Sequence, residues 1–301
     1  MLSQEESIIS YLRLNRTGTR REIARYLGCS TVRVGQIVES PLENRFIIQK
    51  PQLSNTRGRR AASLFLSDTV QLPVLDMTGD VFTLKIMTLS GKCVAERPFL
   101  RNQYFTREEN VAAFIRTAAL YLKRHLTDFS FPCASIMLPF AYHEKTFSDY
   151  CFVDFIIQQI RARLPNWTTV LCTDAEAGAA ALSSRPMPHP DALIVINDER
   201  AFAAFPDERV PIDLSNYSCN GKKLPTCFAE NDGNTLSMFF EHASLFLSAE
   251  SFLVDMKPST SRKTMPLLCP LSNAASFYAY GASLLLLQKL IITASHRKGD
   301  T

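Results

Sequence analysis

The chain has 301 residues, of which 46% are hydrophobic and 21% charged, a balance typical of globular proteins. This composition excludes an intrinsically disordered chain, and the length allows two or three folding units. The net charge of +4 is unevenly distributed: residues 1–68 hold 11 Lys/Arg against 6 Asp/Glu, and the remainder holds 22 against 23. A basic small domain before a nearly neutral large one indicates a polyanionic partner. The alternative is a solvated basic surface without a partner.

The first 40 residues predict three short helices. Ile8, Ile9 and Leu12 recur at helical spacing and predict a helix over residues 5–15. Thr19 and Glu22 have the spacing of a capping box, which predicts that a second helix begins there. This helix should end before Gly28, which can adopt positive φ, and Ser30 should cap a third helix. Pro41 predicts that the third helix stops near Glu39.

Two short helices joined by a glycine turn are typical of a helix-turn-helix. Two strand-like runs, "FIIQK" and "ASLFLS", follow and are joined by an arginine-rich loop, which predicts a β-wing. The third helix should expose polar side chains that can pair with base edges in the major groove, and the wing arginines suit phosphates or a narrow minor groove. The predicted DNA-binding residues are Ser30, Thr31, Arg33, Gln36, Arg57, Arg59 and Arg60. The alternative is a helix-turn-helix that contacts protein.

The rest of the chain alternates strands with helices, which predicts a layered α/β body. Residues 71–76 should form a strand, and 82–99 a hairpin that turns at Ser90 and Gly91. Long amphipathic helices are expected at 107–126 and 149–164. Further elements are expected as strands at 133–138, 168–172 and 192–197 and as a helix at 176–182.

The most apolar segment, residues 281–294, is too short for a membrane span and contains Gln288 and Lys289, so it predicts a buried helix. The polar first ten residues do not resemble a signal peptide. Eight cysteines are scattered without a Cys-x-x-Cys pair, a pattern that suits reduced thiols better than a disulfide framework. We therefore expect a cytoplasmic protein that does not contact a membrane.

Six segments resemble the ROK family (repressor, open reading frame, kinase). They are "ARYLGCSTVRVGQIV", "RGRRAASLFLSD", "LDMTGD", "ASIMLPF", "TDAEAGAAALS" and "YAYGASLLLLQKL". The resemblance implies an α/β fold with a winged helix-turn-helix followed by a two-lobed, actin-like and hexokinase-like body. The expected domains are 1–68 for DNA binding, 69–190 for the first lobe, and 191–301 for the second lobe with a carboxy-terminal helix that packs back.

The residues of the family's phosphate-binding turn are altered in this chain. Where the family has Asp-x-Gly-Gly-Thr, the chain has Asp76, Met77, Thr78, Gly79 and Asp80. Glycine lets backbone amides close on phosphate oxygens, and a second carboxylate at about 4 Å opposes a phosphate by roughly 1 to 4 kcal/mol. The family's second, glycine-rich phosphate loop also lacks its glycines here, because none occurs between Gly178 and Gly221. We expect no nucleotide cofactor and no catalytic residues.

Two further family motifs are altered or of uncertain use. The zinc motif keeps Cys219, Gly221, Cys227 and Glu230 at shifted spacing but lacks one cysteine ligand, so we expect no metal. Asp174 matches the family's catalytic aspartate. Without a nucleotide, Asp174 and Glu230 could bind an effector sugar or sugar phosphate. The alternative for Asp174 is a carboxylate that stabilises a helix amino terminus.

These features predict a transcriptional regulator that binds double-stranded DNA, with a catalytically inactive sugar-kinase-like body. A homodimer on a palindromic operator is expected, since paired recognition helices read half-sites about one turn apart. Two alternatives remain: an active sugar kinase with a DNA-binding appendage, and a protein-interaction scaffold.

Overall fold

The computed structural model forms two compact units, and each is described by itself. The first comprises residues 1–137, 145–171 and 283–301, and the second comprises 138–144 and 172–282. The described residues are 4–51, 62–79, 81–125, 132–139, 147–184, 192–196, 201–205, 211–214, 218–219, 222–223, 239, 252–256, 268–270 and 274–297.

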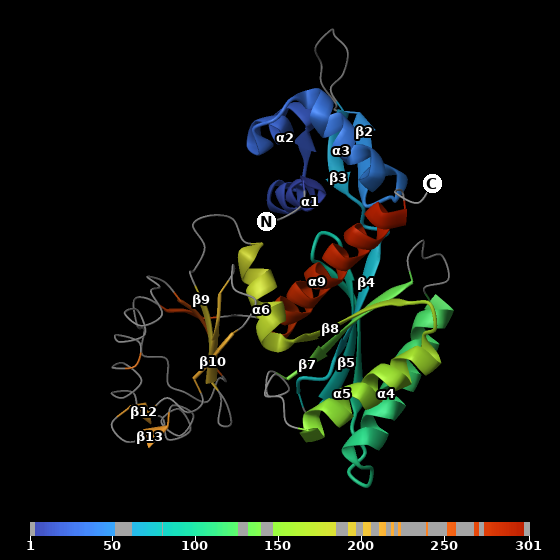
Figure 1. Ribbon diagram of the computed structural model, residues 1–301, viewed down its shortest axis with the longest axis vertical. Helices are drawn as coiled ribbons and strands as arrows, with labels where there is room; N and C mark the ends of the chain where they lie inside the picture. Colours follow the sequence, from blue (N-terminus) through green and yellow to red (C-terminus); the bar gives the residue numbers. More distant parts are fainter. Residues whose placement is uncertain are drawn as a thin grey trace. The chain divides into compact units, whose positions relative to one another are not determined.

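The amino-terminal part of the first unit contains three helices and a small antiparallel sheet (Figure 1). The strand order is β1-β3-β2, and Ile48 of β2 lies opposite Phe65 of β3. The elements are α1 (Gln4–Asn15), β1 (Gly18–Thr19), α2 (Arg20–Leu27), α3 (Thr31–Glu43), β2 (Ile47–Pro51) and β3 (Ala62–Leu66).

Local sequence signals fix the ends of α2 and the start of α3. The Thr19 side chain accepts a hydrogen bond from the Glu22 amide, and the Glu22 carboxylate accepts one from the Thr19 amide at 2.7 Å. Gly28 ends α2 with φ of 63°, a left-handed conformation that costs most other residues energy. Ser30 Oγ accepts from the Arg33 amide at 3.1 Å. The predicted caps are confirmed.

The expected end of α3 near Glu39 is wrong, because the helix continues to Glu43 with Pro41 inside it. Proline lacks an amide hydrogen and disfavours helical geometry in the residue before it. Here Pro41 is buried, and its carbonyl accepts from the Phe46 amide at 2.8 Å. The burial of Pro41 therefore outweighs its tendency to end the helix at the preceding residue.

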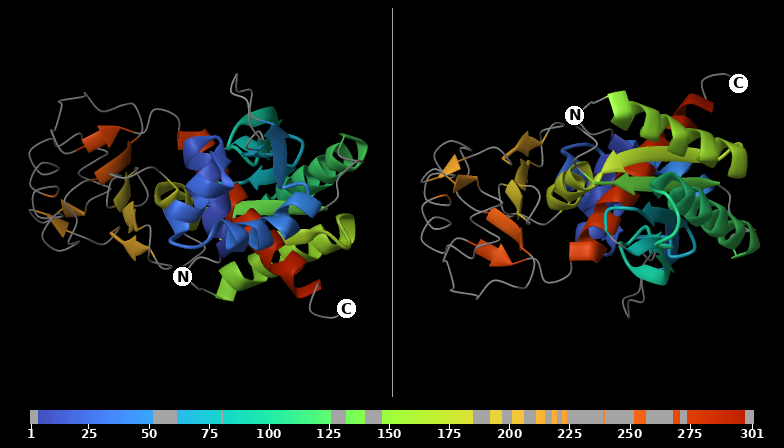
Figure 2. Two further views of the ribbon diagram at one scale, coloured as in Figure 1. Left: turned by 90° about the horizontal axis from the view of Figure 1, so that it is seen from above. Right: turned by 90° about the horizontal axis from the view of Figure 1, so that it is seen from below.

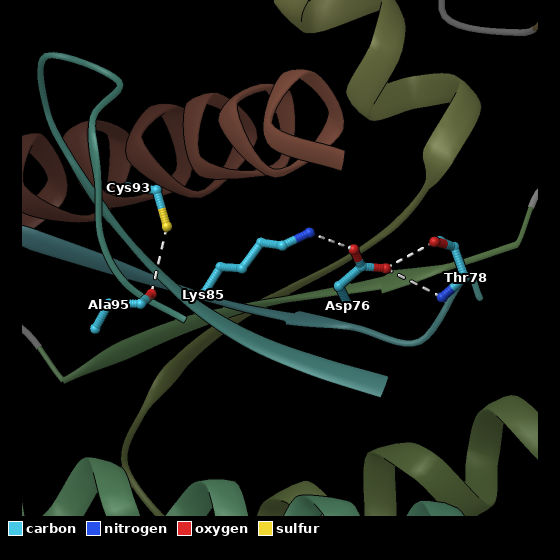
Figure 3. Close-up of polar contacts among 5 residues, drawn as sticks. All are labelled: Asp76, Thr78, Lys85, Cys93 and Ala95. Carbon is cyan, nitrogen blue, oxygen red and sulfur yellow. Dashed lines mark hydrogen bonds and ion pairs between the residues drawn. The ribbon is translucent and has the colours of Figure 1, made fainter. Parts of the chain in front are cut away.

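A second sheet forms the centre of the first unit, in the order β6-β5-β4-β7-β8. β4 pairs antiparallel with β5 and parallel with β7. Helices α4 and α5 lie together on one face of the sheet, and α9 lies on the other (Figure 1, Figure 3). The strands are β4 (Gln71–Asp76), β5 (Val81–Thr88), β6 (Cys93–Leu100), β7 (Cys133–Leu138) and β8 (Thr168–Thr173). The helices are α4 (Arg107–His125), α5 (Phe147–Arg163) and α9 (Ala274–Arg297).

The predicted hairpin between β5 and β6 is confirmed. Gly91 in its turn has φ of 85°, which glycine adopts at little cost. The backbone before this turn also contacts α1: Arg13 Nε donates to the Leu89 carbonyl at 2.7 Å. Ser90 Oγ donates to the Asp68 carboxylate at 3.3 Å, at the end of the segment that leads into β4. The β5–β6 turn thus ties the amino-terminal elements to the central sheet.

The second unit contains a five-stranded sheet of order β11-β10-β9-β14-β15, whose strands are coloured yellow to red in Figure 2. β14 pairs parallel with both β9 and β15. Helix α6 (Asp174–Ser183) packs on β9 and β10. The strands are β9 (Ala192–Ile196), β10 (Ala201–Ala204), β11 (Ile212–Asp213), β14 (Phe252–Met256), β15 (Leu268–Pro270) and a separate pair, β12 (Ser218–Cys219) and β13 (Lys222–Lys223). None of the helices described above has an apolar stretch long enough to cross a membrane.

Close backbone contact between α6 and α9 depends on Gly281. A Cβ atom at this position would overlap the carbonyl group of Ala177 in α6. Gly281→Ala should therefore lower the free energy of unfolding by about 3 kcal/mol, as overpacking against backbone does. The measurement is urea unfolding of the full chain.

Gly35→Ala in α3 is the matched control, since no heavy atom lies within 4 Å of its added Cβ. This change should raise stability by about 0.5–1 kcal/mol through helix propensity. Equal behaviour of the two variants would contradict the α6–α9 contact.

Candidate functional site

The amino-terminal half of α3 presents a polar face. Ser30, Thr31, Arg33 and Gln36 are all exposed there. The opposite face of the helix packs inward through Val34, Ile37 and Val38, which are buried. The 3.6-residue helical period separates the two sets, so the exposed side chains point away from the core. The structure thus brings together four predicted DNA-binding residues, three of them in this helix and the fourth, Ser30, at its cap.

The remaining predicted DNA-binding residues, Arg57, Arg59 and Arg60, lie outside the described residues. Arg33 Nη2 donates to Gln4 Oε1 of α1 at 2.9 Å. Because both side chains are exposed, this bond stabilises little and leaves the guanidinium able to turn outward. Arg33 therefore lies at the surface with one weak intramolecular contact that a ligand can replace.

Three further exposed residues of the amino-terminal part were not singled out in the sequence analysis. Val32 is 70% exposed on α3, an unusual position for a β-branched apolar side chain, and it can contact a thymine methyl group. Arg21 of α2 and Lys50 of β2 are exposed cations that suit phosphate contacts. The basic excess of residues 1–68 could have pointed to the two cations. The helical spacing could have placed Val32 on the polar face of the third helix.

The altered phosphate turn follows β4, and its aspartate is already bonded within the protein (Figure 3). Lys85 Nζ of β5 lies 2.9 Å from Asp76 Oδ2. The other oxygen, Oδ1, accepts from the Thr78 amide at 3.1 Å and from the Thr78 hydroxyl at 2.7 Å. Both carboxylate oxygens are therefore engaged by residues of the hairpin that β4 forms with β5.

Burial makes this ion pair difficult to open. The Lys85 side chain is 4% exposed and that of Asp76 is 11% exposed. A buried charge is stable when it is paired and hydrogen-bonded, and removal of one partner leaves the other uncompensated. Asp76 thus neutralises the buried Lys85 ammonium, and the ion pair links β4 to β5.

Gly79, the glycine retained in the turn, lies in a backbone conformation that other residues can adopt. Gly28 and Gly91 are the described glycines with positive φ, and Gly79 is not among them. Gly79 is exposed, and a Cβ there would meet only the Val81 backbone at ordinary contact distance. Asp80 lies outside the described residues. The position does not require glycine, as it would if its amide curled around an anion.

Cys93 and Cys133, two thiols in strands of the central sheet, have the surroundings of structural groups. Cys93 Sγ, seen beside Lys85 in Figure 3, donates to the Ala95 carbonyl at 3.4 Å. Burial raises the pKa of Cys93, as does the nearby Glu96 charge. Burial raises the pKa of Cys133 to about 12. Both thiols stay protonated at neutral pH, and the thiols of Cys29, Cys93, Cys133, Cys151 and Cys172 are free. Within the described parts of the chain no cluster of His, Cys, Asp or Glu could hold a metal ion.

In the second unit, Asp174 is the first residue of α6. It is 4% exposed, and its Oδ1 accepts from the Ala175 amide at 3.0 Å. Thr173 and Glu176 form a capping box around it, with the Glu176 carboxylate 2.7 Å from the Thr173 amide. This geometry fits a carboxylate at a helix amino terminus. Glu230 and Cys227 lie outside the described residues, so an effector role for Asp174 and Glu230 stays a prediction.

Comparison with known proteins identifies the fold. No family model and no curated protein matches the sequence. A solved ROK family transcriptional regulator, described as a homologue of the E. coli MLC protein, is similar with a TM-score of 0.62 and 11% identity, over 97% of this chain and 98% of its own. A ROK hexokinase from Thermus thermophilus is similar with a TM-score of 0.50 and 11% identity, over 73% of this chain and 100% of its own. The chain has the α/β fold of ROK proteins, as the sequence resemblance predicted.

The two similarities differ in how much of this chain they cover. The hexokinase is matched completely yet leaves about a quarter of this chain unmatched. The regulator is matched over almost the whole of both chains. The unmatched share is close in size to residues 1–68, the segment that carries the basic excess.

Substitution of Lys85 tests whether the buried ion pair holds β4 and β5 together. Lys85→Met should lower the free energy of unfolding by about 3–5 kcal/mol, because it leaves the Asp76 carboxylate buried without its cation. The double variant Asp76→Asn with Lys85→Met should recover part of this loss. Urea unfolding of the full chain measures both.

Lys92→Met is the control, since Lys92 is exposed, and it should change stability by less than about 0.5 kcal/mol. A Lys85→Met variant as stable as Lys92→Met would show that the pair does not hold the hairpin.

Proposed function

We propose that the protein is a ROK-family transcriptional regulator that binds double-stranded DNA through an amino-terminal winged helix-turn-helix. The observation that carries this proposal is the exposed polar surface formed by Thr31, Arg33 and Gln36 of α3 and by its cap, Ser30. Helix α3 follows α2 after a short turn and precedes the antiparallel strands β2 and β3, and residues 1–68 hold 11 basic against 6 acidic residues, which supports a winged helix-turn-helix. Arg33 would pair with guanine and Gln36 with adenine in the major groove.

In this proposal α3 is the recognition helix, and its amino-terminal residues approach the base edges. Val32 would add an apolar contact to a thymine methyl. Arg21 and Lys50, together with Arg57, Arg59 and Arg60 of the wing loop, would bind backbone phosphates and set the register. A homodimer would place two such helices on a palindromic operator.

The body is proposed to be catalytically inactive. A sugar kinase must bind the phosphates of its nucleotide at the turn where this chain pairs Asp76 with Lys85. Without that cradle the two lobes would bind an effector, a sugar or sugar phosphate, and change the spacing of the recognition helices. The free cysteines fit a reducing compartment such as the cytoplasm.

DNA binding is tested with the native upstream region of the gene as probe, measured by fluorescence anisotropy. Arg33→Ala should weaken binding by roughly 5- to 150-fold, the equivalent of about 1–3 kcal/mol for a base contact. Arg116→Ala on the exposed face of α4 is the matched control and should bind like the unaltered chain.

A salt series separates the DNA-binding regulator from the scaffold alternative. The slope of log affinity against log salt should be steep and should fall by about one for Lys50→Ala, because each phosphate contact releases a counterion. A flat slope, or unaltered binding by Arg33→Glu, would contradict DNA recognition and favour a helix-turn-helix that docks on protein.

A further inference from the structure

A glycine lies in the interior of helix α3, within the surface proposed to bind DNA. Gly35 is the fifth of the 13 residues of this helix. Glycine destabilises a helix interior relative to alanine, because it loses more backbone freedom on folding and has no side chain to pack. A residue that weakens the helix at this position needs a reason, either within the fold or outside it.

The described part of the chain gives no reason within the fold. The φ of Gly35 is not positive, as those of Gly28 and Gly91 are, so alanine would adopt the same backbone conformation. A Cβ at Gly35 would have no heavy atom of the described residues within 4 Å. Three other glycines differ, since a Cβ there would overlap a neighbouring residue: Gly18, Gly178 and Gly281. The reason for Gly35 is therefore sought in what α3 contacts outside the fold.

Exposed side chains surround Gly35 on the helix surface. Residues three or four positions apart lie side by side on a helix, which places Thr31, Val32 and Glu39 next to Gly35. Gln36 follows it in the chain, and all four of these neighbours are exposed. The missing Cβ leaves open space among them, and this space is the size of one methyl group.

The neighbours of this open space favour an apolar occupant over a phosphate. Val32 is 70% exposed and presents two methyl groups beside Gly35. The Glu39 carboxylate, one turn further on, repels phosphate oxygens. The major-groove edge of DNA carries one apolar group, the C5 methyl of thymine, and the adenine paired with it has the edge that Gln36 would bind. A thymine methyl therefore matches the position in both size and polarity.

We propose that Gly35 is a specificity-determining residue of the DNA interface, where the bare backbone of α3 and the Val32 side chain receive the C5 methyl of a thymine. This inference rests on the proposed function and adds to it a reason for the glycine. A Cβ at this position would occupy the space of the methyl and hold the helix away from the groove. Gly35→Ala should thus stabilise the fold and weaken DNA binding, two effects of opposite sign.

The test measures binding of the full chain, by fluorescence anisotropy, to a duplex from the native upstream region in which single thymines are replaced in turn by deoxyuridine. At one position this loss of the C5 methyl should weaken binding about fourfold, the effect of one buried methyl group. Gly35→Ala should bind the thymine duplex about fivefold more weakly or worse, since its added methyl overpacks the contact. It should bind the deoxyuridine duplex at least as tightly as the thymine duplex, because the two methyl groups compete for one space.

Gly79→Ala is the matched control, since its added Cβ meets only the Val81 backbone at ordinary contact distance, and it should bind both duplexes like the unaltered chain. Urea unfolding should show that Gly35→Ala is at least as stable as the unaltered chain. Lower stability would overturn the inference, because the glycine would then have a role in the fold.

Equal DNA affinity of Gly35→Ala and the unaltered chain would also overturn the inference. So would an undiminished preference of Gly35→Ala for thymine, or equal affinity of the unaltered chain for every deoxyuridine duplex. In these cases the proposed function would stand, because the unaltered chain still binds DNA. If the unaltered chain bound no duplex at all, the proposed function and this inference would both be contradicted.

Discussion

The buried ion pair between Asp76 and Lys85 constrains what the body of this protein can do. The resemblance to the ROK family aligns Asp76, at the end of β4, with the first residue of the family's phosphate-binding turn. Here one carboxylate oxygen lies 2.9 Å from the Lys85 ammonium, and the other accepts two hydrogen bonds from Thr78. To free the carboxylate for another ligand, the protein would have to leave a cation buried in the central sheet. The cost of such an uncompensated charge is about 3–5 kcal/mol, which favours the closed hairpin.

The end of β5 also lies against the amino-terminal elements. The amino-terminal elements carry the basic excess and the exposed face of α3, and they contact the central sheet where Arg13 binds the Leu89 carbonyl. The β5 strand that supplies Lys85 leads directly to this contact.

Signals confined to a few residues were readable from the sequence. The Thr19–Glu22 box, the left-handed Gly28 and the Gly91 turn are local, and the structure confirms them. Features that depend on tertiary packing were missed. Pro41 stays inside α3 because it is buried, and the position of Lys85 beside Asp76 follows from a strand register that pairs it with Val74. The contacts of Asn110 in α4 were equally hidden, since an asparagine inside a helical pattern gives no sign that its buried amide binds the backbone of Asn102, Phe105 and Thr106.

The most direct test of this account is the thermal unfolding of the full chain with and without magnesium ATP, in the presence of a panel of hexoses. A ligand that binds the native state raises the unfolding temperature by mass action. At about 5 mM ATP, above usual Michaelis constants, we expect no change in the unfolding temperature and no ADP formed. A saturable rise with ATP, accompanied by transfer of phosphate to any hexose, would contradict the central claim that the Asp76–Lys85 pair closes the phosphate site.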